Sequence, residues 1–423
     1  MNTVLMVAFH YPPYFGSSGV QRTLKFSRYL PDSGWKPLVL TAQSRAYPQS
    51  TPEQLAEIPP AVRVIRAFAL DTSRHFAVRG SSLRLMSLPD RWSTWVLGAI
   101  PAGLSLIRRE RPAVIWSTYP IATAHLIGLA LHRFSGLPWV ADFRDSMTED
   151  GYPRDRLTRK SYLALERQVV RRASRIVFTA RSTRAMYLAR YPRLDPDRCV
   201  VISNGYDEVD FASFGDGHTA RPSSRPLRLV HAGLIYPEER DPRPFFRALS
   251  RLKREGQIDQ SAVSIELRAS GSEEAYATML VELGISDLVH LLPAVPYHKV
   301  LRECSEADAL LLLQGPSCNH QIPAKLYEYL RLRKPILALT DARGDTAQIL
   351  AETGGATVLD LLQEDAIHRG LPSFLESLRL GTHALPDRLA TARHARHIQA
   401  QTLGECLDML ATAGTRSRRS VSG

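Results

Sequence analysis

The chain has 423 residues, more than the ~250–300 over which a single hydrophobic core usually grows, so we expect two domains. Hydrophobic residues make up 44% and charged residues 23%, as in an ordinary globular protein, so each domain can bury a core. The formal net charge of +12 suggests an anionic partner (nucleic acid, anionic lipid or a phosphorylated substrate) or only a basic surface, and charge alone does not choose among them.

The cysteines and the apolar stretches predict a cytoplasmic protein. No two of the four cysteines are spaced for a metal site, and free thiols fit a reducing cytosol. The first residues lack the basic region and long apolar run of a signal peptide. The longest charge-free stretch, Trp92–Ile107, is too short for a membrane span and contains Pro101, so we expect a buried or interfacial helix.

The first 212 residues alternate short apolar runs with helical patterns such as Gly19–Pro31 and Ile121–Phe134. Apolar runs separated by helices predict a parallel sheet covered on both faces. We predict strands at Val4–Phe9, Leu38–Thr41, Val62–Ile65, Val114–Ser117, Trp139–Phe143, Ile176–Thr179 and Val200–Ser203.

The alternation stops in a linker over residues 213–226 and restarts in a second domain over 227–385. Its predicted strands are Leu227–Ala232, Ser264–Arg268, Val289–Leu292, Ala309–Leu313, Ile336–Leu339 and Ala356–Leu359. Helices over 386–412 could pack back on the first domain, and 413–423 is a polar tail. The predicted fold class is α/β, with two Rossmann-like, doubly wound parallel-sheet domains that face a central cleft.

The segment NHQIPAKLYEYLRLRKPILAL, Asn319–Leu339, carries the strongest chemical signal. Pro323 stands where a helix would begin, and its first N–H groups favour an anion. Lys325 and Glu328 share one face of that helix, where one could neutralise a phosphate and the other accept ribose hydroxyls. An amphipathic surface helix with an intrahelical ion pair explains the same pattern equally well.

This segment resembles the donor-binding signature of the family-four retaining glycosyltransferases, which have the GT-B fold. The resemblance implies that Glu328 binds the donor ribose and Lys325 the diphosphate, with Pro323 and Leu326 in the same donor-binding helix start. The family often has a second glutamate where this sequence has His320, so the identity of the sugar stays open.

Three further segments of the second domain extend the resemblance. HAGLIYPEERDPRPFFRAL implies that Gly233 lets the backbone approach the diphosphate and that Arg240 binds phosphate, although Leu234 stands where a basic residue is usual. Arg240 could instead be a surface arginine in an acidic loop. The Gly271 turn would lie near the donor, and the nucleobase would rest on the backbone near Val295.

In the first domain, the loop that contains Gly16 and Gly19 would lie over the donor phosphates, or Gly19 serves only close packing. Asp142, Arg144 and Asp145 follow a strand and could orient an acceptor hydroxyl and a leaving phosphate. A structural salt bridge at the strand end is the alternative for these three.

Other features of the first domain carry less weight. His125, in an apolar helix, is expected to be a packed core residue. The basic stretch Arg154–Arg175, with Trp92 and Trp95, could lie on an anionic membrane surface or be only a solvated basic face. Ser203–Asp207 resembles the family's turn at the domain crossover and is expected to be hinge-like.

The resemblance therefore implies a retaining transferase that moves a sugar from a nucleotide-diphosphate sugar to a glycan, lipid-linked or small-molecule acceptor. The expected catalytic residues are Asp142, Arg144, Asp145, Arg240 and Lys325, which position the substrates and stabilise charge without a cofactor, metal or enzymatic nucleophile. The expected location is the cytoplasm or the inner face of the membrane. The alternatives are a nucleotide-sugar epimerase on the same fold and a non-catalytic binding protein. No nucleic-acid-binding module is visible.

Overall fold

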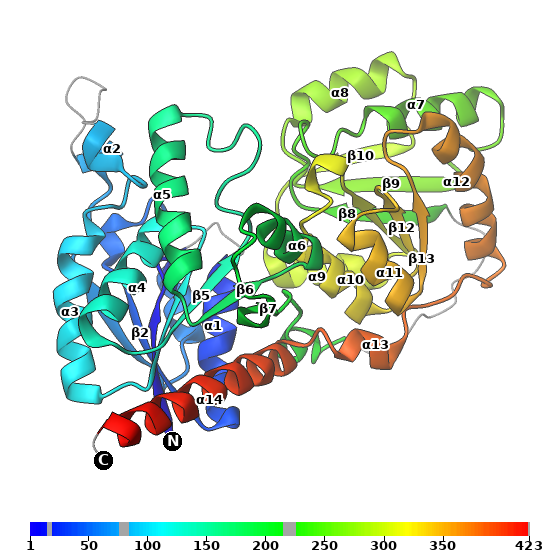
Figure 1. Ribbon diagram of the computed structural model, residues 1–423. Helices are drawn as coiled ribbons and strands as arrows, with labels where there is room; N and C mark the ends of the chain where they lie inside the picture. The colour runs from blue at the N-terminus through cyan, green and yellow to red at the C-terminus, as the bar shows by residue number, and fades with distance from the viewer. Residues whose placement is uncertain (15–18, 76–83, 215–225, 422–423) are drawn as a thin grey trace. The chain divides into compact units, whose positions relative to one another are not determined.

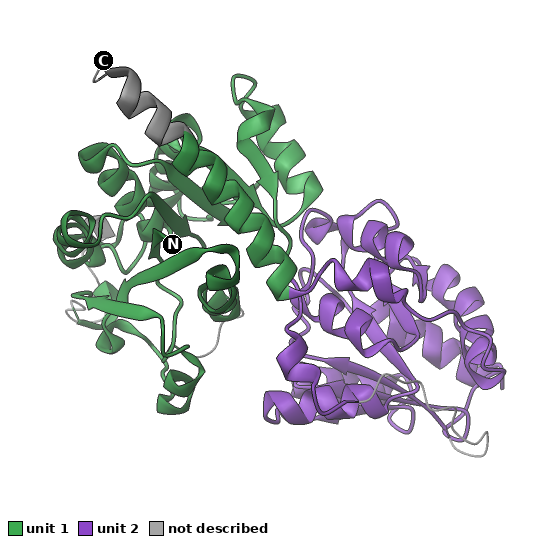
Figure 2. Ribbon diagram, turned by 90° about the horizontal axis from the view of Figure 1, so that it is seen from below, with its two compact units in different colours: residues 1–204, 396–423 green, residues 205–395 purple. Residues whose placement is uncertain are grey.

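The computed structural model describes residues 1–14, 19–75, 84–214 and 226–421. The chain forms two compact units, Met1–Asn204 with Arg396–Gly423, and Gly205–Ala395 (Figure 2). Of the residues singled out above, Gly16 and most of the 213–226 linker lie outside the described residues.

The first unit is a parallel sheet with the strand order β3-β2-β1-β4-β5-β6-β7 among its described residues (Figure 1). Its strands are β1 (Asn2–Val7), β2 (Trp35–Ala42), β3 (Arg63–Ala67), β4 (Val114–Thr118), β5 (Trp139–Arg144), β6 (Arg175–Phe178) and β7 (Cys199–Val201). Its helices are α1 (Gly19–Tyr29), α2 (Thr72–His75), α3 (Trp95–Glu110), α4 (Ala122–Ser135), α5 (Arg156–Arg172), α6 (Arg181–Arg190) and α14 (Arg396–Val421).

Alternate residues of β1 enter two different cores, because side chains of a strand point to opposite faces of the sheet. Leu5 and Val7 pack with apolar residues of α3 and α4. Val4 and Met6 pack with residues of α1 and α14 on the other face. A sheet buried on both faces needs continuous apolar strands, which explains why short apolar runs located these strands in the sequence.

The C-terminal helix α14 belongs to the first unit although it follows the second in the chain (Figures 1 and 2). Its residues Ala400, Leu403 and Leu407 are buried in the core shared with α1. The Trp35 indole donates a 2.9 Å hydrogen bond to Asp408 of this helix.

The second unit is a parallel sheet with the order β10-β9-β8-β11-β12-β13 within its described part. Its strands are β8 (Leu227–Ala232), β9 (Val263–Arg268), β10 (Val289–Leu292), β11 (Ala309–Leu313), β12 (Ile336–Leu339) and β13 (Ala356–Leu359). Its helices are α7 (Arg243–Arg254), α8 (Glu273–Glu282), α9 (Tyr297–Glu306), α10 (Ala324–Leu332), α11 (Asp345–Thr353), α12 (Glu364–Arg379) and α13 (Arg388–Ala392). The prediction of two doubly wound α/β domains is confirmed.

The tryptophans that the sequence placed near a membrane surface are buried. Trp92 is 9% exposed and Trp95 is fully buried, and both lie in the core between the sheet and α3. They cannot form an exposed membrane-binding face, so the structure does not support the membrane-surface alternative for these two residues. No helix among the described residues has the length and apolarity needed to cross a membrane.

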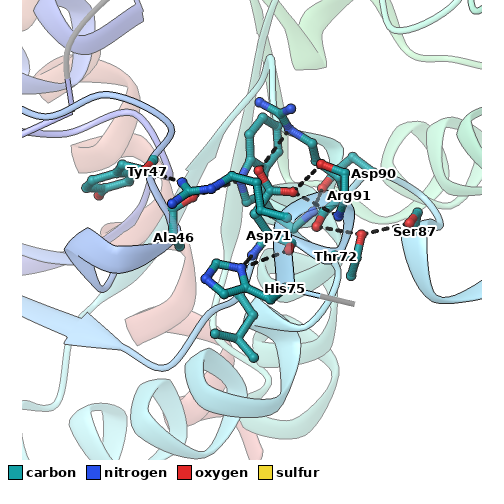
Figure 3. Close-up of polar contacts among 12 residues, drawn as sticks. Ala46, Tyr47, Asp71, Thr72, His75, Ser87, Asp90 and Arg91 are labelled. Atoms are coloured by element: carbon teal, nitrogen blue, oxygen red, sulfur yellow. Dashed lines mark hydrogen bonds and ion pairs between the residues drawn. The ribbon is translucent and has the colours of Figure 1, made fainter. Parts of the chain in front are cut away.

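A polar network joins the two ends of the segment between β3 and α3 (Figure 3). The Thr72 hydroxyl contacts the Ser87 hydroxyl at 2.7 Å and donates to the Arg91 carbonyl. The Arg91 guanidinium lies 3.6 Å from the Asp71 carboxylate. Asp90 accepts hydrogen bonds from the backbone and hydroxyl of Thr123 at the start of α4, and burial raises its pKa. These polar groups therefore hold the two described ends of the segment to each other and to the start of α4.

Candidate functional site

A pocket of about 160 Å³ lies at the carboxyl end of β8 in the second unit. We call it the Lys325 pocket. Loops that follow parallel strands form it together with one face of α10, the place where open α/β sheets bind ligands. It is lined by Ala232, Gly233, Arg268, Ala269, Ala294, Val295, Val300, Leu301, Cys304, Lys325, Glu328, Tyr329 and Leu332.

The Lys325 side chain reaches from α10 to the end of β8. Its Nζ lies 3.1 Å from Nε2 of His231, the penultimate residue before the turn at Gly233. Gly233 has φ +101°, and a Cβ atom there would lie 3.2 Å from Nζ. A glycine is thus needed for the backbone conformation, and it also leaves room for the ammonium.

The environment of Lys325 weakens its positive charge. Burial is the main cause, and the guanidinium of Arg240 adds repulsion, so the pKa of Lys325 falls to about 7, while the Glu328 carboxylate acts in the opposite direction. Two cations held close together in a buried place are poised to accept an anion, which would offset both the desolvation and the repulsion.

Glu328 and Lys325 face different partners. The Glu328 Oε1 accepts a 2.8 Å hydrogen bond from the Tyr297 hydroxyl of α9, whereas Lys325 bonds to His231 of β8. This arrangement differs from the simple intrahelical ion pair that the sequence left open. It places a carboxylate at the rim of the pocket and an ammonium at its base.

The structure brings together part of the predicted donor-binding set. Gly233, Val295, Lys325 and Glu328 all line the Lys325 pocket. The remaining described members that belong to the second unit lie outside the lining, as listed here: Arg240, Gly271, Pro323 and Leu326. Of these, Leu326 is a fully buried residue whose side chain is part of the interior of the unit.

Arg240 and Pro323 remain near the pocket without lining it. Arg240 is 15% exposed in its side chain and lies 3.2 Å from Glu239, yet its charge is close enough to lower the pKa values of Lys325 and His231. Pro323 is the residue immediately before α10 and has extended backbone angles. The turn at Gly271, φ +69°, is closed by a bond from its N–H to Glu273.

Sequence reasoning missed Arg268, which lines this pocket, and His231, which contacts Lys325 from β8. Each is a polar residue that is buried near the carboxyl end of its strand, and a polar residue at that end was the available signal. Arg268 forms a 2.8 Å ion pair with Glu303 of α9. Arg268 is neutralised by this pair, so Lys325 is the cation of the pocket lining that has no ion pair among the described contacts.

At the carboxyl edge of the first sheet, Asp142 is held in a fully buried ion pair. Its two oxygens accept from Nε and Nη2 of Arg22 at 2.8 and 2.9 Å, and the Thr118 hydroxyl donates to Oδ2 at 2.9 Å. Arg22 was not singled out in the sequence, since nothing local relates α1 to β5. Asp142 thus has the geometry of the structural salt bridge that the sequence left as an alternative.

Arg144 has a different position from Asp142. It has φ +58°, and Thr179 donates to its carbonyl through both its N–H and its hydroxyl. Its guanidinium is buried with His10, whose pKa falls to about 3 through burial and the charge of Arg144. Asp145, partly exposed, and Gly19, buried at the start of α1, complete the predicted residues that the structure describes at this edge.

His125 is the packed core residue expected. Its Nδ1 lies 2.8 Å from the Ser117 hydroxyl, its ring packs against Phe143, and burial lowers its pKa to about 4. Among the described residues, no group of three or more histidine, cysteine, aspartate or glutamate side chains is arranged to hold a metal ion.

The comparisons with known proteins agree with this fold. Residues 18–205 match the family model described as a glycosyl transferase 4-like domain. No curated protein matches the chain in sequence. Several solved structures that resemble it over nearly its whole length are named as glycosyltransferases, and all of these are of low sequence identity.

A glycosyltransferase from Rickettsia africae is 10% identical, covers 97% of this chain and 98% of its own, and has a TM-score of 0.62. HepE of Anabaena in complex with UDP is 14% identical, and the match covers 99% of this chain and 100% of HepE, with a TM-score of 0.59. WaaG, a glycosyltransferase involved in lipopolysaccharide biosynthesis, is 16% identical, with 96% and 99% coverage and a TM-score of 0.56. The chain therefore has the GT-B fold, and residues 18–205 of its first unit match a glycosyl transferase 4-like domain.

Proposed function

We propose that this protein transfers a sugar from a nucleoside-diphosphate sugar to an acceptor hydroxyl, with retention of the anomeric configuration. The observation that carries the proposal is the Lys325 pocket, in which a buried ammonium faces a glycine turn and a carboxylate stands at the rim. We infer that the Lys325 ammonium and the Gly233 turn would bind the diphosphate of the donor. The Glu328 carboxylate would accept hydrogen bonds from the ribose diol. HepE, which shares the fold, has been solved with UDP and with UDP-glucose.

In the proposed reaction the chain acts through position and charge. Lys325, with Arg240 nearby, would stabilise the negative charge that develops on the departing diphosphate. Glu328 would accept the ribose hydroxyls, with its oxygen oriented by Tyr297. Retention follows from the family resemblance, and we infer that the acceptor attacks from the face on which the diphosphate leaves.

The first experiment measures thermal stabilisation of the purified protein by UDP, GDP, ADP, CMP and their sugars. A ligand that binds only the native state raises the melting temperature by mass action. We expect a shift with one diphosphate that is lost in Glu328→Ala, whereas Glu282→Ala, at the end of α8, keeps it. No shift with any nucleotide would overturn the proposed donor site.

The stereochemical part is tested separately. The product formed from the donor identified above would be examined by NMR for its anomeric coupling constant. The donor's own configuration in the product supports retention, and the opposite configuration overturns it. Sugar release or rearrangement without an acceptor would instead indicate hydrolysis or epimerisation, but neither the epimerase nor the non-catalytic alternative is favoured by a feature of the pocket.

A further inference from the structure

We propose that His231 is a positioning residue for the donor site: in its neutral form it accepts a hydrogen bond from the Lys325 ammonium and aims that ammonium at the Gly233 turn. The inference rests on the proposed function, because it concerns the same pocket. It assigns a role to a residue that the family signature in the sequence did not single out.

The first step is the tautomer of His231, which the backbone determines. Nδ1 lies 2.9 Å from the Leu311 carbonyl of the neighbouring strand β11. A carbonyl oxygen only accepts, so Nδ1 carries the proton and donates it. In a neutral imidazole the other nitrogen, Nε2, is then an acceptor.

The second step is the partner of Nε2. Lys325 Nζ, which has only donors, lies 3.1 Å away. The Gly233 carbonyl is 3.2 Å from the same nitrogen and would bind it only in the other tautomer, which would leave the shorter, 2.9 Å contact of Nδ1 with the Leu311 carbonyl without a proton. We therefore assign the ammonium as the partner of Nε2. A protonated His231 would place two cations in contact, and burial and the Lys325 charge lower its pKa well below the ordinary value.

The third step is what this bond does for Lys325. A long, flexible side chain that must meet a diphosphate loses less freedom on binding when it is already held in place. A hydrogen bond that accepts from an ammonium also favours its charged form. We infer that the bond to His231 favours the charged form of Lys325, whereas burial and Arg240 lower the pKa of Lys325. Glu328, on the same helix as Lys325, and the Cys304 thiol of α9 also raise this pKa.

The consequence is that donor binding is linked to a proton. Lys325 is only partly charged near neutral pH in the empty pocket, since its pKa is about 7. A bound diphosphate favours the ammonium, so binding takes up a proton and affinity falls as the pH rises above about 7. A nucleotide sugar is the appropriate ligand, because unlike a terminal phosphate it has no ionisation near pH 6.

Two variants of His231 separate positioning from mere structure. Asn keeps a donor where Nδ1 bonds to Leu311 but has no acceptor at the place of Nε2. Gln keeps a carbonyl oxygen at the place of Nε2 and gives up the bond to Leu311. We expect His231→Asn to weaken nucleotide-sugar binding by roughly tenfold or more, as for a lost hydrogen bond to a charged group, and His231→Gln to restore most of it.

The measurement is calorimetric titration of each protein with the nucleotide sugar from pH 6 to 9, in buffers of different ionisation enthalpy. We expect proton uptake in the wild type, and in His231→Asn a fall in affinity that begins at a lower pH. Equal affinities and equal pH profiles for Asn and Gln, or a greater loss in Gln, would overturn the role of His231. No binding by the wild type would instead overturn the proposed function, and this inference with it.

The tautomer can be tested without relying on either variant's affinity. Nitrogen-15 NMR of histidine-labelled wild-type protein, with His231 assigned by the signal missing in His231→Asn, should show a proton on Nδ1 and an unprotonated Nε2 at pH 7. If His231→Asn does not fold, the His231 signal is assigned from His231→Gln instead. A proton on Nε2 and none on Nδ1 would contradict the inference.

Discussion

The Arg22 guanidinium and the Asp142 carboxylate form a two-point ion pair that joins α1 to the end of β5, across 120 residues of sequence. Both side chains are almost completely buried, at 1% and 0% exposure. Arg22 also donates to the carbonyls of Ile202 and Ser203, so one residue ties three segments of the first unit together.

Asp142→Asn should destabilise the first unit strongly. Removing one partner leaves a buried guanidinium without its counter-charge, which typically costs about 3–5 kcal/mol. Urea unfolding monitored by the unit's tryptophans measures this. Glu110→Gln is the matched control, because its pair with Arg63 is half exposed and should contribute less than about 1 kcal/mol. Unchanged stability with lost turnover would support the catalytic interpretation of Asp142 instead.

Gly233→Ala should impair donor binding more than stability. The residue has φ +101°, and its new Cβ would lie 3.2 Å from Lys325 Nζ. The backbone strain alone is worth roughly 1–2 kcal/mol. Gly284→Ala, at φ +67° with nothing within 4 Å, is a control for a left-handed glycine without the contact, and its backbone strain is smaller because φ +67° is within the left-handed region. Thermal shift with the donor nucleotide should be lost in the first variant and kept in the second, and equal behaviour of the two would contradict the proposed closeness to the ligand.

Tyr297→Phe should weaken donor affinity modestly, whereas Glu328→Gln should weaken it severely. The tyrosine only orients the carboxylate oxygen, through a 2.8 Å bond at an exposed rim, so its loss is expected to cost about 1 kcal/mol, or roughly fivefold. The glutamine removes the charged acceptor itself. Michaelis constants for the donor measure both effects. A larger loss in Tyr297→Phe than in Glu328→Gln would indicate that the hydroxyl, and not the carboxylate, contacts the ligand.

Stability should fall as the pH is lowered from about 6.5 toward 4. Burial lowers the pKa of His10 to about 3 and that of His125 to about 4, while the unfolded chain protonates these groups near 6.5. The unfolded state therefore binds more protons below pH 6.5, so the stability present above that pH is lost on acidification.

Urea midpoints at pH 7 and pH 5 test this dependence. His125→Asn, which can keep a bond to Ser117, should reduce the difference between the two midpoints even if it lowers both. A variant with the same pH dependence as the wild type would show that His125 is not among the groups responsible.

The sequence by itself determined the secondary structure and the strand sets of both sheets. A strand buried on both faces must be continuously apolar, and this local requirement is visible without the fold; β8, β10, β11, β12 and β13 have the predicted bounds. The sequence also located Lys325 and Glu328, because both belong to one helical segment that resembles a family signature.

The tertiary structure decided which polar residues meet. Arg22 reaches Asp142 and His231 reaches Lys325 because the order of parallel strands brings distant segments to the same sheet edge, and no periodicity records that order. Burial was equally non-local: the sequence left open whether Trp92 and Trp95 lie at a membrane surface, and the structure buries both in the core that packs against the first sheet. A local sequence pattern predicts a helix or a strand because the formation of that element depends mainly on nearby residues. The partners and charge states of buried groups depend instead on every element that packs around them.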